Sequence, residues 1–230
     1  MTIAIIGAME EEVGLLLDKM DIQAKETIAN CLFIRGTLEE KELILLRSGI
    51  GKVNAAMATT ILHERYQPNV VINTGSAGGL DPQLSIGDII ISDRVVHHDV
   101  DATAFDYEYG QVPGMPFYYE SDPKLIKMVE QSIQEINKVK CQQGLIATGD
   151  SFIQEPEAMQ AIQEKFPDVI AAEMEAVAIA QVCHQYETPF VVIRALSDIA
   201  GKESAHSFDQ FVEQAAQHAA ELIIKVVTKL

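Results

Sequence analysis

Short apolar runs that alternate with helix-like segments constrain the fold of this chain more than any other feature. The runs at 2–7, 70–74 and 190–195 are largely apolar and end at a glycine or a polar turn. Such runs are typical of strands buried on both faces of a parallel sheet. We therefore expect an α/β domain in which helices cover both faces of a mostly parallel sheet. The 230 residues contain no repeat, linker or break in composition, which predicts one domain over 1–230.

The same patterns predict the order of the elements. Strands are expected at 2–7, 31–37, 42–48, 70–74, 87–96, 143–149 and 190–195, and helices at 10–19, 52–65, 122–137, 155–165 and 174–186. A last helix is indicated by apolar residues at three- and four-residue spacing between Phe208 and Val226. Residues 97–121 have no clear period but hold six aromatic side chains. They form either a pocket wall or subunit interface, or a loop folded over its own small cluster.

Charge excludes two classes of partner. Asp and Glu number 34 against 17 Lys and Arg, a formal net charge of −17, and no basic stripe offsets it. Such a surface repels phosphate backbones and anionic lipid headgroups, so we expect neither nucleic-acid nor membrane binding. No apolar run approaches the ~20 residues that span a bilayer.

The location is predicted to be cytoplasmic. The first residues carry no basic leader and run directly into Glu10, so a signal peptide is not expected. Cys31, Cys141 and Cys183 are odd in number, far apart and free of any C-x-x-C pair. That usage disfavours a disulfide framework or a cysteine zinc site and fits a reducing compartment.

Six turns after predicted strands outline a candidate site, because ligands of open α/β sheets bind beyond the carboxyl ends of the strands. These turns lie at 8–12, 48–52, 75–79, 148–153, 173–175 and 197–198. Their glycines permit close approach of a ligand to the backbone, and their carboxylates can bind sugar hydroxyls or exchange protons. The residues alone therefore favour a neutral or cationic polyhydroxy ligand.

Several familiar motifs are incomplete. Asn54 stands where the third glycine of a dinucleotide fingerprint is needed, and Leu46 where a P-loop has its first glycine. Ser76 is preceded two residues earlier by Thr74, so it is no hydrolase elbow. Neither Ser76 nor a cysteine has an evident base partner. Residues 97–101, with two histidines and two aspartates, could ligate a metal, although adjacent histidines point apart in an extended chain.

Five motifs in order resemble those of bacterial 5′-methylthioadenosine/S-adenosylhomocysteine nucleosidases. They are Gly7-Ala8-Met9-Glu10-Glu11-Glu12, Ser48-Gly49-Ile50-Gly51-Lys52, Asn73-Thr74-Gly75-Ser76-Ala77-Gly78-Gly79, Glu173-Met174-Glu175-Ala176 and Arg194-Ala195-Leu196-Ser197-Asp198. The resemblance covers nearly the whole chain. It implies the nucleoside phosphorylase fold, a single-domain three-layer α/β/α architecture with a mixed, partly closed twisted sheet.

The resemblance also implies an activity. Water would attack C1′ of a 5′-substituted adenosine and adenine would leave, with no metal or organic cofactor. The substrates would be methylthioadenosine, adenosylhomocysteine and 5′-deoxyadenosine, and the products adenine plus 5-methylthioribose or S-ribosylhomocysteine.

Catalytic roles follow for two carboxylates. Asp198, oriented by Ser197, would protonate adenine N7, which requires a pKa raised by burial or by acidic neighbours. Glu12 would deprotonate the water. Without the resemblance, the residues favour Asp198 as the cap of the following helix and Glu12 as a solvated first-turn glutamate.

Binding roles are carried over in the same way. Glu175 would bind the ribose hydroxyls, Met174 would pack on the sugar, and Arg194 and Ser76 would hold the water or neighbouring carboxylates. Phe152 would stack on adenine and Ile153 would bind it through its backbone. Ile50 and Phe208 would line the 5′-alkylthio subsite. The remaining predicted pocket residues are Ala8, Met9, Gly78 and Glu173.

The resemblance further implies a homodimer with a shared site. Phe105, Tyr107 and Pro113, on the aromatic segment 97–121, would reach the partner's 5′ subsite. This favours the interface interpretation of that segment over a self-contained cluster.

Three alternatives remain open. A phosphorylase, or a nucleosidase for another adenosine-like substrate such as aminofutalosine, is the nearest. Charge disfavours the phosphorylase, since a carboxylate about 4 Å from a phosphate costs several kcal/mol at an effective dielectric near 20. A non-catalytic nucleoside-binding module and a dinucleotide-binding enzyme are the other two.

Overall fold

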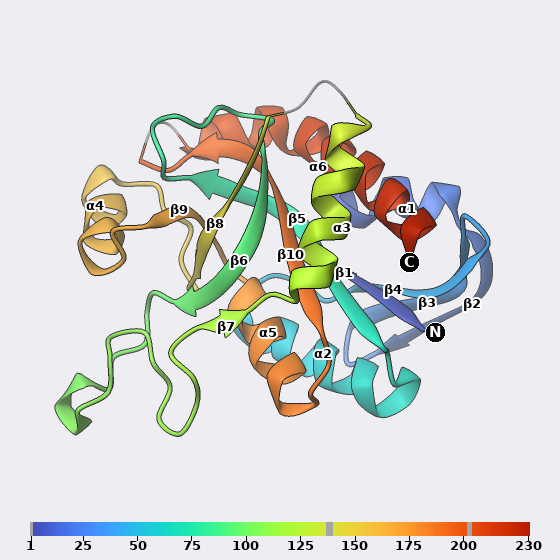
Figure 1. Cartoon of the computed structure of the whole chain (residues 1–230), viewed down its shortest axis with the longest axis horizontal. Coiled ribbons are helices and arrows are strands. Elements are labelled where there is room, and N and C mark those ends of the chain that lie inside the picture. The colour runs from blue at the N-terminus through green and yellow to red at the C-terminus, as the bar shows by residue number, and fades with distance from the viewer. Residues whose placement is uncertain (1, 137–139, 202–203) are drawn as a thin grey trace.

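A ten-stranded mixed sheet forms the centre of the protein (Figure 1). The computed structural model describes residues 2–136, 140–201 and 204–230. The strands are β1 Ile3–Gly7, β2 Asp21–Ile28, β3 Cys31–Leu38, β4 Lys41–Arg47, β5 Val70–Gly79, β6 Ile89–His97, β7 Tyr119–Glu120, β8 Cys141–Thr148, β9 Val169–Glu173 and β10 Phe190–Ile199. Parallel pairs join β1 to β4 and β5, and β10 to β5, whereas β2, β3 and β4 are antiparallel.

Five strands of the sheet close on themselves to form a barrel. β5 pairs with β10, β10 with β6, β6 with β8, β8 with β9, and β9 again with β5. β1 pairs with the first half of β5, and β4, β3 and β2 follow it to extend the sheet, while the short β7 pairs with β6. The predicted mixed, partly closed α/β fold is therefore confirmed.

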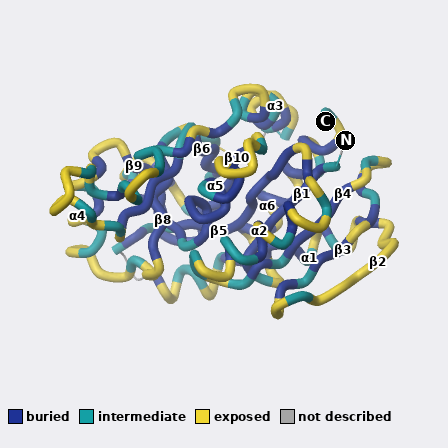
Figure 2. The backbone as a smooth tube through the Cα atoms, turned by 90° about the horizontal axis from the view of Figure 1, so that it is seen from below, coloured by how far each residue is buried: buried dark blue, intermediate teal, exposed yellow. Residues whose placement is uncertain are grey.

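Helices cover both faces of the sheet (Figure 1). They are α1 Glu10–Lys19, α2 Lys52–Tyr66, α3 Pro123–Gln134, α4 Pro156–Lys165, α5 Ala176–Gln185 and α6 Ser204–Lys229. One core cluster packs α1, α3 and α6 on one side, another packs α2 and α5 on the other, and a smaller one lies under α4. Figure 2 shows the sheet as a largely buried band between exposed helix and loop surfaces. Among the described residues, no helix is long and apolar enough to cross a membrane.

Two strands run further than their apolar patterns indicate. β5 continues through Gly79 and β10 through Ile199, where Ile199 pairs with Gly79. The segments 75–79 and 197–198, predicted as turns beyond strands, are therefore strand residues. Closure of the barrel supplies the pairing partners that keep them extended.

Other boundaries differ because some strands lack a local signal. β2 is exposed almost throughout, so it shows no alternation of apolar and polar residues. β9 is short, and the helix predicted at 174–186 begins after it, at Ala176. The helix predicted at 122–137 ends at Gln134, and its predicted last residue lies outside the described residues.

The aromatic segment 97–121 has two parts. Tyr109 and Phe117 pack near Phe166, with ring centroids 6.2 and 6.4 Å away, so this part covers a local cluster. A 3-10 turn, Thr103–Phe105, lies at the tip, and Phe105 is 75% exposed. The segment thus combines a packed base with an aromatic tip that the described part of the chain leaves mostly exposed.

Candidate active site

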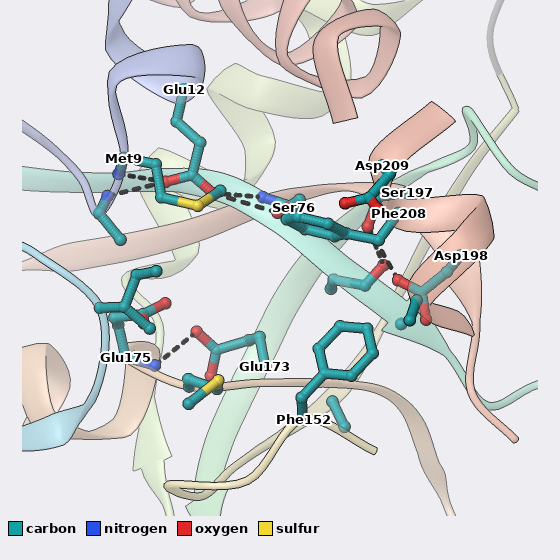
Figure 3. A pocket seen from close by; sticks show the side chains of 17 residues that line it. Met9, Glu12, Ser76, Phe152, Glu173, Glu175, Ser197, Asp198, Phe208 and Asp209 are labelled. Carbon is teal, nitrogen blue, oxygen red and sulfur yellow. Dashed lines mark hydrogen bonds between the residues drawn. The ribbon is translucent and has the colours of Figure 1, made fainter. Parts of the chain in front are cut away.

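A cavity of about 380 Å³ opens where β5, β9 and β10 meet the beginnings of α1 and α6 (Figure 3). It collects residues from each predicted turn. Its lining consists of Ala8, Met9, Glu12, Ile50, Ser76, Ala77, Gly78, Phe152, Ala172, Glu173, Met174, Glu175, Ser197, Asp198, Ala205, Phe208 and Asp209.

Glu12 is fixed at the inner wall of this cavity. Its Oε2 accepts the backbone N–H groups of Ala8 and Met9 at 2.7 and 3.1 Å, which caps the first turn of α1. Its Oε1 accepts from the backbone N–H and hydroxyl of Ser76 at 2.9 and 3.1 Å. With 5% of its surface exposed, Glu12 is not a solvated first-turn glutamate. Glu10, by contrast, is exposed and pairs with Arg47.

Glycine is required beside this carboxylate. A Cβ on Gly75 would lie 2.7 Å from Glu12 Oε1, closer than real Cβ contacts allow. Because Gly75 has no side chain, the Glu12 carboxylate can approach β5 closely enough to reach Ser76.

Asp198 projects from β10 at the opposite end of the cavity (Figure 3). Burial raises the pKa of its carboxyl, and hydrogen bonds from Ser197 and Ser204 only partly offset that effect. The Ser197 hydroxyl lies 2.9 Å from Asp198 Oδ1. A Cβ on Gly78 would come within 3.0 Å of Asp198 Oδ2. A raised pKa favours a carboxyl that can donate a proton near neutral pH.

Behind the cavity, a buried arginine pairs with the carboxylate of Glu173. Arg194 Nη2 lies 2.5 Å from Glu173 Oε2 and 2.7 Å from Asn73 Oδ1, and its side chain is 1% exposed. Glu173 Oε2 also accepts the N–H groups of Glu175 and Ala176 at 3.0 and 2.8 Å, at the start of α5. Arg194 therefore holds Glu173 from behind the wall of the cavity.

Glu175 has a raised pKa. Burial, followed by the charge of Glu173, raises its pKa to about 8, although Arg194 and the Gly51 N–H act in the other direction. Gly51 N donates to Glu175 Oε1 at 2.8 Å. Three carboxylates share one guanidinium here, so retention of a proton on Glu175 relieves their repulsion.

Apolar side chains form the remaining walls. The rings of Phe152 and Phe208 meet edge to face with centroids 5.8 Å apart. Ile50 and Phe152 are 50% and 44% exposed, which is high for large apolar side chains at the mouth of a cavity. These surfaces suit a flat aromatic ring and an apolar substituent.

The structure places some predicted residues elsewhere. Arg194 lies behind the lining, and Ile153 lines a small adjoining cavity together with Phe152 and Asp198. Phe105, Tyr107 and Pro113 do not line the cavity of their own chain. Sequence reasoning missed Ala77, Ala172, Ala205 and Asp209. Ala205 and Asp209 stand three before and one after Phe208, on one face of α6, so helical spacing could have found them.

The run at 97–101 is occupied by protein contacts. His97 Nε2 lies 3.0 Å from Gln181 Oε1, and Asp99 pairs with Lys52. In the described part of the chain, no three His, Cys, Asp or Glu side chains are grouped to hold a metal.

Taken together, the cavity offers a protonatable carboxyl at one end, a carboxylate at the other, and aromatic walls between them. This arrangement can protonate a leaving heterocycle and activate water against the atom that it leaves.

Comparison with known proteins gives concordant matches. The family model described as the phosphorylase superfamily matches residues 2–229. The 5′-methylthioadenosine/S-adenosylhomocysteine nucleosidase of Bacillus subtilis is 58% identical, with 100% of both chains covered. The nucleosidase of the same name from Neisseria meningitidis, solved in complex with methylthio-immucillin-A, is 44% identical with a TM-score of 0.97, covering 100% of this chain and 99% of that one. The futalosine hydrolase of Helicobacter pylori is 32% identical with a TM-score of 0.94, covering 100% and 98%.

Proposed function

This chain belongs to the phosphorylase superfamily and, within it, to the bacterial 5′-methylthioadenosine/S-adenosylhomocysteine nucleosidases, and from that premise we propose how its cavity works. The protein is an N-glycosyl hydrolase. It cleaves methylthioadenosine and S-adenosylhomocysteine to adenine and the corresponding thioribose. We extend this to 5′-deoxyadenosine, which lacks only the thio substituent. The observation that carries the assignment is the placement of Glu12 and Asp198 at opposite ends of one cavity.

Asp198 acts as the acid in this proposal. Adenine is a poor leaving group until N7 is protonated, and the raised pKa of Asp198 supports a carboxyl that holds a proton to donate. The Ser197 hydroxyl fixes its orientation. Phe152 stacks on the adenine, and the backbone beside Ile153 binds its edge.

Glu12 acts as the base. Its four hydrogen bonds leave it fixed at the cavity wall, beside the position that water must occupy to attack C1′. Ser76 holds the carboxylate from the β5 side. Glu175 binds the ribose hydroxyls, and Met174 packs against the ring.

The same carboxylate argues against phosphorolysis. A phosphate in place of the water would face Glu12, and repulsion of this kind costs several kcal/mol at about 4 Å and an effective dielectric near 20. Arg194 cannot compensate, because its guanidinium already contacts Glu173 and Asn73.

The aromatic tip completes the site in a homodimer. Phe105 is 75% exposed on the segment 97–121, while Ile50 and Phe152 present apolar surface at the mouth of the cavity. In our proposal Phe105, Tyr107 and Pro113 cover the partner's 5′ subsite, next to Ile50 and Phe208. A second copy thereby buries apolar surface that a single chain leaves exposed.

We place the enzyme in the cytoplasm, where its free cysteines Cys31, Cys141 and Cys183 would stay reduced.

Adenine release from methylthioadenosine in phosphate-free buffer tests this function, with aminofutalosine as a parallel substrate. We expect release from methylthioadenosine and adenosylhomocysteine without phosphate. Release that requires phosphate would establish a phosphorylase, and preferential release from aminofutalosine would move the substrate toward that of the futalosine hydrolase.

A further inference from the structure

A closed ring of hydrogen bonds lies just outside the cavity and joins three separate segments. Asp99 Oδ1 accepts from Lys52 Nζ at 2.5 Å, and Asp99 Oδ2 accepts the Asp150 N–H at 3.0 Å. Asp150 Oδ1 in turn accepts the Lys52 N–H at 2.8 Å. We call these three residues the Asp99 ring. None of them lines the cavity, so any effect on the reaction must be transmitted through neighbours.

Each member of the Asp99 ring adjoins a wall of the site. Lys52 begins α2 two residues after Ile50, and Asp150 precedes Phe152 by two residues. Asp99 lies two residues after the end of β6, near the start of the aromatic segment 97–121. The ring therefore ties together the 5′-side wall, the adenine wall and the root of the segment that carries Phe105.

The start of α2 depends on this ring. Its N-cap is Gly51, with a φ of 93°, which has no side chain to satisfy the first N–H groups of the helix. Side-chain oxygens of two acidic residues from distant segments take that place. Asp150 accepts the Lys52 N–H and Glu175 accepts the Gly51 N–H. Carboxylates at a helix N-terminus are favoured by the helix dipole, and here they also fix where Ile50 stands.

Asp99 is charged in this arrangement. Burial alone would raise its pKa, but the Lys52 ammonium and the Asp150 N–H outweigh that effect and hold the pKa below its usual range. The side chains of Lys52 and Asp99 are 18% and 29% exposed. Ion pairs that water reaches add little to folding stability, so the expected effect of the ring is on position.

We propose that Asp99 is a positioning residue that holds the Ile50 wall, the Phe152 wall and the root of the aromatic segment in one arrangement. The proposal rests on the proposed function and deepens it. The walls bind the nucleoside, whereas Glu12 and Asp198 act on the reacting bond. Loss of Asp99 therefore raises KM and leaves kcat nearly unchanged.

The test compares Asp99→Ala, Asp99→Asn and Lys52→Met with the wild type, using methylthioadenosine kinetics and the calorimetric Kd for adenine. Asp99→Ala is expected to raise KM and the adenine Kd about tenfold, with kcat within about twofold. Asp99→Asn should recover most of the affinity that Asp99→Ala loses, because its amide oxygen still accepts the Asp150 N–H. Lys52→Met keeps its backbone N–H and gives a smaller rise.

A matched control breaks an ion pair remote from the site. Glu135→Ala removes the partner of Lys229, whose Nζ lies 2.7 Å from Glu135 Oε1, and should change neither constant. An unchanged KM and Kd in Asp99→Ala, or a lower kcat at constant KM, would overturn the proposal, since the latter reports only lost folded enzyme. If the wild type released no adenine, the proposed function would fail, and the adenine Kd values would still decide the role of Asp99.

Discussion

The Ser197 hydroxyl lies 2.9 Å from Asp198 Oδ1 at the end of β10, and both side chains are buried. Burial favours the neutral carboxyl, while the hydroxyl fixes its direction toward the cavity. The neighbouring β5 contributes Gly78, whose missing side chain leaves room for the carboxyl. Two adjacent strands thus supply both the proposed proton donor and the space that its carboxyl occupies.

Asp198→Asn should lower kcat for methylthioadenosine by about 10²–10⁴-fold, because an amide cannot deliver a proton to N7. The amide oxygen can still accept from Ser197, so the melting temperature should change little. Steady-state kinetics and thermal melting on the same preparation check both expectations. Turnover near the wild-type value in a normally melting protein would remove Asp198 from the mechanism.

Asp198 also predicts the pH dependence of turnover. The active form carries a proton on Asp198, and its pKa is raised by burial, so kcat should fall as pH rises through that value. A profile of kcat against pH checks this. A kcat that rises steadily across the same alkaline range would show that the ionised carboxylate is the working form.

Glu12→Gln should abolish turnover and also reduce stability. The new NH₂ group must face either the N–H groups of Ala8 and Met9 or that of Ser76, and all of these are donors. An unsatisfied buried donor costs about 1–3 kcal/mol, which should appear as a lower melting temperature. Substantial activity in the folded variant would contradict the role of Glu12 as base.

Gly75→Ala should lower kcat by about 10–100-fold through displacement of Glu12, since the new Cβ would stand 2.7 Å from Oε1. Gly14→Ala, on α1 with no atom within 4 Å of the added Cβ, is the matched control. It should retain activity and gain about 0.5–1 kcal/mol of stability. Equal activity in the two variants would mean that the position of Glu12 is not critical.

Glu175→Gln should stabilise the protein at alkaline pH. The folded protein raises the pKa of Glu175 from 4.5 to about 8, so the protonated form is favoured on folding. The stability that it contributes is fully present below pH 4.5 and is lost as pH rises through about 8. The substitution removes this loss, and each kcal/mol gained raises the melting temperature by about 2–4 °C.

Melting curves across this pH range check the Glu175 prediction. Kinetics should also show a higher KM, because the proposed contact with the ribose is altered. A variant that melts below the wild type at every pH would indicate that Glu175 is ionised in the folded protein.

Subunit complementation tests the shared site. Phe105→Ala should raise KM, and Glu12→Gln should be inactive. In mixed dimers, the site of the Phe105→Ala subunit receives an intact aromatic tip from its Glu12→Gln partner. Co-refolding should therefore give a population of sites with nearly wild-type KM. A KM in the mixture equal to that of Phe105→Ala alone, or a monomeric mass by light scattering, would contradict the dimer.

The elements that the sequence predicts well are those with a local signal. β1, α1, the β3–β4 hairpin and α2 follow from apolar runs, glycines and helical spacing within a few residues. β9 and the ends of β5 and β10 do not, because only their pairing around the barrel keeps them extended.

The site divides in the same way. Motif residues such as Glu12, Ser76 and Asp198 line one cavity, since they stand on neighbouring strands and turns. The Asp99 ring has no signal in the sequence, because its members are 47–98 positions apart and meet only through the fold. In the sequence, Asp99 belongs to the histidine-rich run 97–101, a possible metal site, and in the structure side chains of this run contact other residues of the protein.

The most direct test of the account is the identity of the sugar released from methylthioadenosine when phosphate is present in excess. Mass spectrometry of the products distinguishes the two possible nucleophiles. We predict free 5-methylthioribose at an unchanged rate, because Glu12 activates water and repels phosphate. Accumulation of 5-methylthioribose 1-phosphate would contradict it and make phosphate the nucleophile.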